Sequence, residues 1–249
     1  AHACEYSIVK LNRSLKIYIL PPIRQQFIQY LLSDYPAETL HETIPDFHNT
    51  VKRYRDLEAA IAADVAGRRK CVEPEIAFVM ERKAELGALL DLQHAGKLPL
   101  RVTHNDTKLN NIMMDEKTGR GICVIDLDTV MPGLSLYDFG DSIRYGANTG
   151  AEDEEDLTRV SLDLSLYRLY KKGYLEGSRG SLGALEKKLL PVGAKLMTLE
   201  CGIRFLTDYL NGDTYFKIHR KQQNLDRCRS QFALVADMEK KWDAMCKED

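Results

Sequence analysis

The sequence lacks the features that mark several large classes of protein. Its 35 Lys and Arg residues are offset by 37 Asp and Glu residues, so it has none of the basic excess that general nucleic-acid binders carry. The six Cys residues form no Cys-x-x-Cys pair, which argues against a zinc site or a disulfide framework and favours reduced thiols. No apolar run approaches the roughly 18 residues that a membrane span needs. We therefore expect a cytoplasmic protein that binds neither nucleic acid nor a membrane.

The composition that remains is that of a folded globular chain. Hydrophobic residues make up 44% and charged residues 29% of the 249 positions, and a chain of this length can bury a sizeable core without disulfides. The expected fold is mainly α with a small central β-hairpin (α+β). Extended segments are expected at 15–20, 100–103, 112–114 and 122–125, the last two being joined as the hairpin. Helical spacing of apolar residues predicts helices from Ile23 to Pro36 and over 51–66, 75–95, 137–146, 166–176, 183–209 and 219–246.

Polar residues gather at the open end of this hairpin. Asp106 follows the extended segment that precedes the hairpin, Asn111 stands where the first hairpin strand begins, and Asp126 stands where the second one ends. Because the two strands run antiparallel, Asn111 and Asp126 come to the same end. An amide oxygen, a carboxylate, phosphate oxygens and water are a suitable ligand set for Mg²⁺. Asp106 is then left to accept a proton from a substrate hydroxyl.

The order and spacing of these residues resemble a known catalytic pattern. His104, Asp106 and Asn111 fit the His-x-Asp-x-x-x-x-Asn loop of the protein-kinase-like superfamily, which a metal-binding Asp follows. Asp126 takes that place, with a Gly seven and an Asp twelve residues further on, as in the branch of aminoglycoside phosphotransferases and choline kinases. The triplet Asp138-Phe139-Gly140 lies too far downstream to be the metal loop. The resemblance implies a kinase-like C-terminal catalytic lobe that uses ATP and Mg²⁺.

A wider set of stretches resembles the N-acetylhexosamine 1-kinase family. Members of that family phosphorylate the anomeric hydroxyl of N-acetylglucosamine or N-acetylgalactosamine with ATP and Mg²⁺. The resemblance implies a sugar kinase whose partners are a nucleotide and a small sugar, and whose product is the sugar 1-phosphate. It extends over residues 26–249, and its clearest stretches are 39–50, 101–111, 124–133, 136–144, 202–210 and 212–216.

The resemblance also implies roles for single residues. Asp106 is the base or the hydroxyl-orienting residue, since orientation matters more than proton abstraction in a loose phosphoryl transition state. Lys108 either reaches the transferring phosphate or is an exposed surface lysine. Arg204 and Tyr215 stand beside the acceptor sugar, where a planar fork of donors and an aromatic face are useful. The alternatives are a helix-surface ion pair for Arg204 and core packing for Tyr215.

Other residues are assigned to structural support or left open. His104 is expected to pack beneath the catalytic loop, and Asp138 to hold that loop by accepting backbone N–H groups. Asp128 either contacts the metal or the sugar or lies in solvent. His48 and Asn49 either border the cleft or are plain loop residues.

The segment before residue 26 is atypical for the superfamily. An N-terminal β lobe normally supplies a phosphate-covering loop and a Lys clamp, yet no Gly-x-Gly-x-x-Gly occurs before residue 100. We expect residues 1–25 to be a remnant of that missing lobe and 26–249 to be the C-terminal lobe alone, weakly active or inactive as a kinase. The apolar surface that a missing lobe leaves open would favour self-association.

Two alternatives differ from a hexosamine kinase. One is a non-catalytic remnant that binds a sugar or a protein partner, and the intact set of Asp106, Asn111 and Asp126 speaks against it. The other is a kinase for a different small alcohol, such as choline or an aminoglycoside. A choline site calls for an aromatic cage and an aminoglycoside site for a dense acidic cleft, and neither the single Trp242 nor Arg204 favours them.

Overall fold

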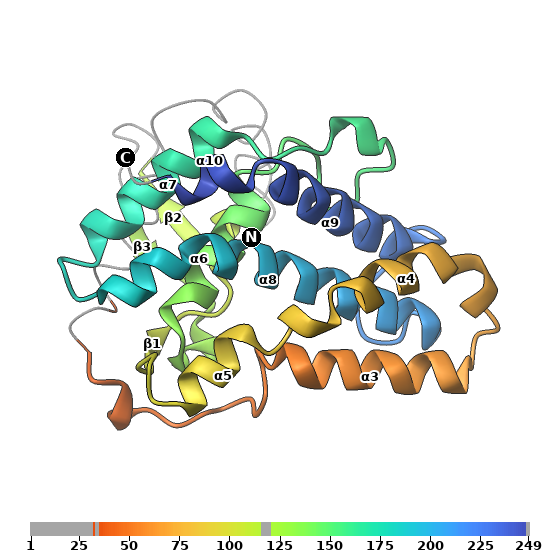
Figure 1. Ribbon diagram of the computed structural model, residues 1–249, viewed down its shortest axis with the longest axis horizontal. Helices are drawn as coiled ribbons and strands as arrows, with labels where there is room; N and C mark the ends of the chain where they lie inside the picture. The colour runs from red at the N-terminus through yellow and green to blue at the C-terminus, as the bar shows by residue number, and fades with distance from the viewer. Residues whose placement is uncertain (1–31, 33–34, 116–120, 248–249) are drawn as a thin grey trace.

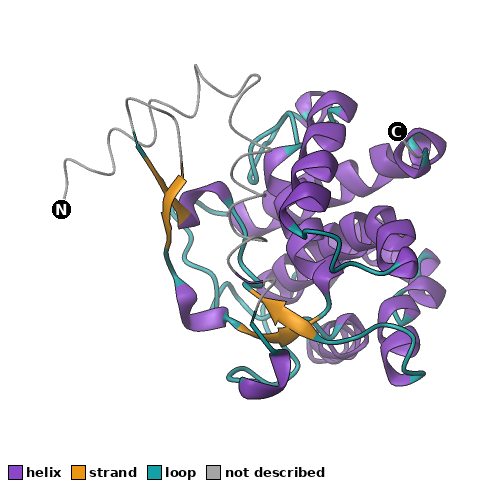
Figure 2. Cartoon of the chain, turned by 90° about the vertical axis from the view of Figure 1, so that its left-hand side faces the viewer, coloured by secondary structure: helices purple, strands orange, loops and turns teal. Residues whose placement is uncertain are grey.

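A computed structural model describes residues 32, 35–115 and 121–247 of the chain. The atypical segment 1–25, with the strand expected in it, lies outside the described residues, as do nearly all of the helix expected from Ile23 and most of the hairpin loop. Helices dominate the described part, and Figure 2 shows the short strands at one edge of the helical mass. The expected fold class, mainly α with a small β component, is confirmed. None of the helices in the described ranges combines the length and apolar character of a membrane span.

Long, strongly periodic segments fold as the sequence predicts. Three helices in the C-terminal half begin and end within two residues of their expected bounds. An earlier helix is capped by Asn49, which accepts the N–H of Lys52 at 2.9 Å, and it ends where Asp64 adopts a left-handed conformation with φ of 40°. These helices are α3 (Thr50–Ala63), α6 (Ser135–Gly146), α7 (Leu164–Gly177) and α8 (Ala184–Leu210).

The helix predicted over 75–95 is interrupted. It divides into α4 (Glu73–Glu81) and α5 (Ala88–His94). At the break, the Arg82 guanidinium donates to the carbonyl of Phe78 at 2.8 Å. A side chain that satisfies a terminal carbonyl allows the chain to leave the helix, which periodicity alone does not reveal.

The helix predicted over 219–246 begins later and is also divided. It forms α9 (Gln223–Lys240) and α10 (Trp242–Cys246). The side chain of Gln223 accepts the N–H of His219 at 2.7 Å, which stabilises the preceding residues as a loop. Gln222, with φ of 65°, then turns the chain into α9.

Two short antiparallel sheets adjoin the segment 104–111. One pairs β2 with β3 and is the predicted hairpin, while the other pairs β1 with β4. The sequence does not predict β4, because that strand has three residues, contains Pro132 and finds its partner far away in the chain. The strands are β1 (Arg101–Thr103), β2 (Ile112–Met114), β3 (Gly121–Val124) and β4 (Met131–Gly133).

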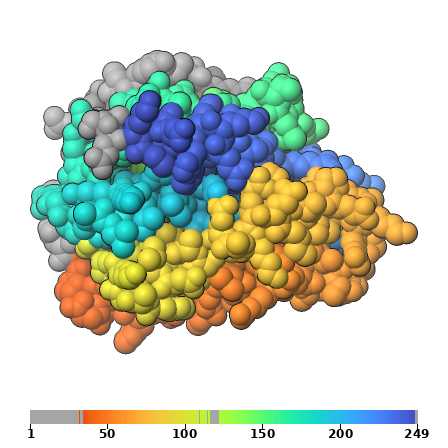
Figure 3. All heavy atoms as spheres, viewed as in Figure 1, coloured from red at the N-terminus to blue at the C-terminus, as the bar shows by residue number. Residues whose placement is uncertain are grey.

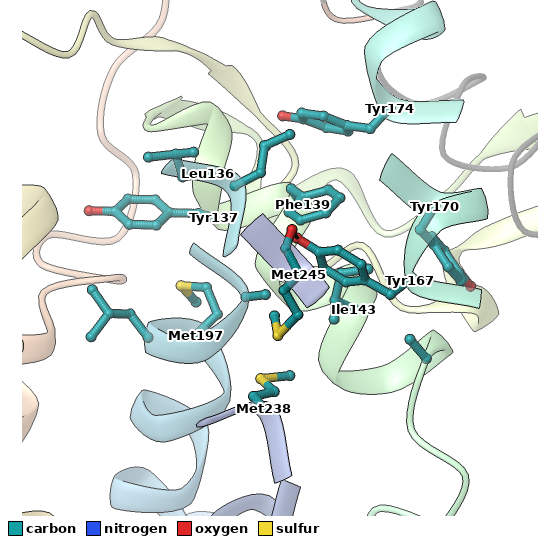
Figure 4. Close-up of a cluster of buried hydrophobic side chains, with 14 of the residues drawn as sticks. Leu136, Tyr137, Phe139, Ile143, Tyr167, Tyr170, Tyr174, Met197, Met238 and Met245 are labelled. Atoms are coloured by element: carbon teal, nitrogen blue, oxygen red, sulfur yellow. Dashed lines mark hydrogen bonds between the residues drawn. The ribbon is translucent and has the colours of Figure 1, made fainter. Parts of the chain in front are cut away.

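Helix α8 is the axis around which other helices pack. Figure 1 shows it crossing the centre of the molecule between α9 and α3, and α6 packs closely against it. One hydrophobic cluster gathers around Phe139, Tyr167 and Tyr174, as Figure 4 shows. A second cluster gathers around Leu57 and Phe232. Because α8 contributes side chains to both clusters, it joins them into one core.

Segments that are distant in the sequence also meet at the surface. Figure 3 shows α4, in light orange, side by side with α9, in dark blue. Arg82, at the end of α4, pairs with Glu239 of α9 at 2.7 Å. Helix α4 is therefore joined to α9 at the surface, although the two lie far apart in the sequence.

The close approach of α6 and α8 gives a prediction about stability. A methyl group added at Gly140 would collide with the backbone carbonyl of Gly193 and with the Met197 side chain. We expect Gly140→Ala to lower the free energy of unfolding by roughly 1–3 kcal/mol, measured by urea denaturation. Gly183→Ala is the control for crowding: its new methyl group meets an ordinary contact at 3.5 Å, so only the N-cap preference for glycine is lost and the change in stability should be smaller. A Gly140→Ala protein as stable as the wild type would contradict this packing.

Candidate active site

Two carboxylates of α6 hold the segment 104–111, the catalytic loop. Asp138, which is 0% exposed, accepts the backbone N–H groups of His104 at 2.8 Å and Asn105 at 2.7 Å. Asp141, one turn further, accepts the N–H of Thr107 at 2.7 Å. Buried backbone N–H groups need acceptors, and these two side chains supply them. The loop is therefore anchored to α6 at three backbone positions.

The two carboxylates differ in their electrostatic surroundings. Burial raises the pKa of Asp138, and the hydrogen bonds from the loop oppose this only in part. Burial also acts upward on Asp141, but the charges of Arg144 and His48 outweigh it, and the pKa of Asp141 is lowered. Arg144 pairs with Asp141 at 2.7 Å and with Glu152 at 2.8 Å. A buried guanidinium thus balances the negative charge next to the loop.

The loop brings three of the expected site residues together. Lys108 Nζ lies 2.7 Å from Asp106 Oδ2, and Asn111 Nδ2 donates to the same oxygen at 3.0 Å and to the Asp106 carbonyl at 2.8 Å. Burial acts to lower the pKa of Lys108, but the hydrogen bond with Asp106 and the charges of Asp106, Asp126 and Asp141 raise it. The Lys108 ammonium therefore belongs to this cluster and stays charged.

Asp126 lies at the same end of the hairpin as Asn111. The N–H of Ile125 donates to the Asn111 carbonyl at 2.9 Å, and Asp126 follows in a left-handed conformation with φ of 62°. Its side chain is exposed. Both hydrogen bonds donated by the Asn111 amide go to Asp106, so Asn111 Oδ1 remains for a cation. Together with the Asp126 carboxylate and phosphate oxygens, it fits the oxygen ligands that Mg²⁺ prefers.

A metal at this place would depend on the nucleotide. The described ranges contain no group of three or more His, Cys, Asp or Glu side chains that could hold a metal ion by themselves. An amide oxygen and one carboxylate are weak ligands alone, and Mg²⁺ commonly completes its shell with substrate phosphates and water. The donor set therefore fits Mg²⁺ bound jointly with ATP.

His104 connects the catalytic loop with the hairpin. Its side chain is buried, and its Nε2 lies 3.1 Å from the carbonyl of Ile125, directly before Asp126. Thr129 Oγ1 donates to the His104 carbonyl at 2.6 Å, which ties the loop to the next turn as well. Asp128, on that turn, is exposed. The loop and the open end of the hairpin, where Asp126 stands, are thus parts of one connected structure.

Arg204 and Tyr215 line one pocket with a volume of about 210 Å³. The Arg204 guanidinium lies 5.5 Å from the ring centres of both Phe47 and Phe216. Tyr215 is 72% exposed and meets Phe216 edge-on at 4.8 Å, so core packing does not describe it. The pocket is further lined by Arg53, Asp56, Thr207, Asp208 and Asn211.

Asp208 supports this pocket, and the sequence analysis did not identify it. Its carboxylate accepts the N–H groups of Thr214 and Tyr215 at 2.9 and 2.8 Å, and that of Phe216 at 2.9 Å. Three backbone N–H groups bound to one carboxylate fix the loop that carries Tyr215. The available signal is a lone Asp in the apolar last turns of a long helix, shortly before a turn at Gly212.

Two adjacent residues connect the pocket with the catalytic loop. The Phe47 ring faces Arg204, and the His48 ring lies 3.2 Å from the carbonyl of Asn105. Asn105 directly precedes Asp106 in the chain. Arg204 is therefore linked to the catalytic loop through Phe47 and His48, although Arg204 and Asp106 come from distant parts of the sequence.

Residues 37–171 match the phosphotransferase enzyme family, and the chain belongs to that family. The matched segment is more than half of the chain and contains both the catalytic loop and the hairpin. The protein is therefore a small-molecule phosphotransferase of the kinase-like class, whose members in general use a nucleotide and a divalent metal. The match does not distinguish the N-acetylhexosamine 1-kinases within the family, and Arg204 and Tyr215 lie beyond it.

The ligand set gives a testable expectation for the metal. With ATP bound, Asn111 Oδ1 and Asp126 should both coordinate one Mg²⁺ octahedrally at ~2.1 Å. Asp126→Asn should weaken Mg²⁺-dependent ATP binding by at least about tenfold, measured by titration calorimetry, because a neutral amide attracts the ion less. Asp91→Asn, an exposed carboxylate of α5, is the control and should keep the wild-type affinity. A crystal structure with ordered Mg·ATP and these two oxygens more than ~8 Å apart would contradict the arrangement.

Proposed function

We propose that the protein transfers the γ-phosphoryl group of ATP to the anomeric hydroxyl of an N-acetylhexosamine, N-acetylglucosamine or N-acetylgalactosamine, with Mg²⁺ as cofactor. The product is the sugar 1-phosphate. The observation that carries the proposal is a pocket with Arg204 and Tyr215 that is linked, through Phe47 and His48, to the loop presenting Asp106. Family membership supports phosphoryl transfer to a small molecule, and the chemistry of the pocket supports a sugar as the acceptor.

Asp106 orients the acceptor hydroxyl in this mechanism. Phosphoryl transfer passes through a loose transition state with the attacking and leaving oxygens in line, so positioning contributes more than proton removal. Lys108 and Asn111 hold the Asp106 carboxylate at 2.7 and 3.0 Å. A carboxylate restrained in this way can direct the hydroxyl oxygen toward phosphorus and take up its proton as the new P–O bond forms.

Lys108, Asn111 and Asp126 serve the phosphates. The raised pKa of Lys108 keeps its ammonium charged, so it can remain on Asp106 and donate to an oxygen of the transferring phosphoryl group. Asn111 and Asp126 would hold the metal at the end of the hairpin. When bound, Mg²⁺ neutralises charge on the phosphate oxygens.

The pocket suits the two kinds of surface that a sugar presents. The hydroxyl and acetamide oxygens of an N-acetylhexosamine accept hydrogen bonds, which a planar guanidinium donates in pairs. The C–H faces of the sugar ring are apolar and can lie against an aromatic ring. Arg204 lies near two rings and Tyr215 offers an exposed ring and hydroxyl, so both surfaces have a partner.

The charge of the pocket favours a neutral acceptor over choline or an aminoglycoside. Arg204 would repel a cationic acceptor. The two carboxylates of the pocket are already engaged, since Asp56 pairs with Lys52 at 2.9 Å and Asp208 accepts backbone N–H groups. A cation entering the pocket would therefore meet a guanidinium without an uncompensated carboxylate to offset it.

We assign residues 26–249 to a single kinase-like catalytic lobe, because the two hydrophobic clusters of the described part share α8. Met113, Ile122 and Leu127, on and beside the hairpin, are 47%, 57% and 57% exposed. Exposed apolar side chains along the hairpin would contact the adenine ring, or another copy of this chain in self-association. Weak turnover stays our prediction for this chain.

The decisive experiment measures sugar 1-phosphate formed from ATP, Mg²⁺ and each N-acetylhexosamine by phosphorus NMR. We expect product at a rate below the ~1 s⁻¹ at the lower end of ordinary enzymes. Asp106→Asn should lower kcat by roughly 10²–10⁴-fold and change ATP affinity little, because Asp106 contacts the hydroxyl and not the metal. If the variant kept more than half of the wild-type kcat, Asp106 would have no essential role in the transfer step.

The same assay separates the alternatives. Transfer to choline or an aminoglycoside, but to neither hexosamine, would show a kinase for another alcohol. Binding of an N-acetylhexosamine without transfer to any acceptor would show a non-catalytic sugar-binding protein. Either result would contradict the proposed reaction.

Arg204 gives a separate prediction about the acceptor. Arg204→Met keeps the length of the side chain and removes its charge and its donors. We expect the KM for the sugar to rise roughly 10- to 100-fold, because a charge-assisted hydrogen bond contributes about 1.5–3 kcal/mol, while the KM for ATP stays the same. Tyr35→Phe, an exposed tyrosine outside the pocket, is the control and should change neither value. A higher KM for ATP alone would indicate that Arg204 contacts the nucleotide and not the sugar.

A further inference from the structure

A buried histidine and glutamate connect the catalytic loop with α8. His48 Nδ1 lies 2.8 Å from Glu200 Oε1, and His48 Nε2 lies 3.2 Å from the carbonyl oxygen of Asn105. The side chains of His48 and Glu200 are 6% and 1% exposed. The pair therefore reaches from the residue before Asp106 to the helix that carries Arg204.

The two contacts determine which nitrogens of the His48 ring carry hydrogen. A backbone carbonyl can only accept, so Nε2 must donate in the contact with Asn105. An ionised carboxylate also only accepts, so Nδ1 must donate in the contact with Glu200. A neutral ring has one N–H and can satisfy one of the two acceptors. With Glu200 ionised, only the imidazolium cation can donate in both contacts together.

Glu200 has the surroundings of an ionised carboxylate. Burial acts to raise its pKa, but the hydrogen bond and charge of His48, the Thr50 hydroxyl and the charge of Arg204 outweigh it, and the pKa is lowered. Thr50 Oγ1 donates to Glu200 Oε2 at 2.6 Å, so each carboxylate oxygen has its own donor. A buried ion pair needs this kind of complete hydrogen bonding to offset its loss of hydration.

The groups that face the pair from neighbouring elements agree with this charge state. The Tyr137 ring of α6 lies 5.0 Å from the His48 ring, and burial, together with the charge of Glu200, raises its pKa, so it remains neutral. Asp141, also on α6, supplies a second negative charge that His48 helps to stabilise. Phe47 meets His48 edge-on at 4.7 Å. A cation at His48 is thus favoured by Glu200 and, less strongly, by Asp141, which is already paired with Arg144, and it is shielded by two rings.

We propose that His48, held as an imidazolium by Glu200, is a positioning residue that orients Asp106 for phosphoryl transfer, an inference that rests on the proposed role of Asp106. Asn105 has φ of 63°, a left-handed conformation that is uncommon for residues other than glycine. Asp138 binds the Asn105 N–H at 2.7 Å, and His48 binds the Asn105 carbonyl at 3.2 Å. Both peptide groups that flank Asn105 are therefore anchored. The second of them joins Asn105 to Asp106 and directs the Asp106 side chain.

The His48–Glu200 pair also links Asp106 to the pocket that contains Arg204. Arg204 follows Glu200 by four residues on α8, so the two side chains lie on the same face of the helix. A sugar bound at Arg204 is then held by the helix that, through Glu200 and His48, sets the position of Asp106. Loss of this connection should reduce the rate of transfer more than the binding of either substrate.

Nitrogen NMR of the His48 ring tests the charge state without any turnover. His48→Gln identifies the resonances by their absence. At neutral pH, we expect hydrogen on both ring nitrogens of His48 in the wild-type protein, and on one of them in Glu200→Gln, where the ring has lost its charged partner. A wild-type ring with hydrogen on one nitrogen would overturn the proposal, whether or not the protein transfers phosphate.

Steady-state kinetics test the positioning role. We expect His48→Gln to lower kcat by roughly 10- to 100-fold, with little change in the KM of either substrate, because a displaced base affects the transfer step. His41→Gln, an exposed histidine of the same segment, is the matched control and should keep the wild-type kcat. A folded His48→Gln protein with unchanged kcat, or with a raised KM alone, would overturn the role. An inactive wild-type protein would count against the proposed reaction instead, and the NMR measurement would then decide the inference.

Discussion

The geometry of the site depends on one buried carboxylate. Asp138 lies in the first turns of α6, where the helix dipole favours negative charge, and it accepts two consecutive N–H groups of the catalytic loop. Without it, two inward-pointing N–H groups would lack an acceptor, at a cost of about 1–3 kcal/mol each. Asp106, Lys108 and Asn111 follow directly in the chain. The position of α6 therefore determines where these three residues lie. Helix α6 is itself packed on α8 at Gly140.

Helix α8 positions the other parts of the site. Glu200, Arg204 and Asp208 are spaced four residues apart and so share one face of the helix. The first contacts His48 next to the catalytic loop, the second faces the pocket, and the third holds the loop that carries Tyr215. One helix thus fixes the relative positions of the catalytic loop, the pocket and the loop that carries Tyr215, although the catalytic loop lies far from α8 in the sequence. This suits a reaction that depends on positioning.

The sequence predicts the parts of the site that depend on local geometry. Asn111 and Asp126 come to one end because a hairpin brings its own strands together, and a motif with fixed spacing places Asp106 beside Asn111. The contact of His48 with Glu200 joins residues 152 positions apart, and no periodicity or spacing indicates it. Strand β4 is missed for a similar reason, since its three residues become a strand through pairing with distant β1.

Several carboxylates of the site have a cationic partner, and Asp126 differs from them in a way that bears on the division of roles. Asp106 is paired with Lys108, Asp141 of α6 with Arg144, and Glu200 of α8 with His48. Asp126 is exposed and acts on Lys108 through its charge alone. A carboxylate that is already compensated attracts a dication less than one that faces solvent. This difference agrees with the proposed division of roles, in which Asp126 holds the metal and Asp106 orients the hydroxyl, because chemically identical side chains in different surroundings can serve different steps.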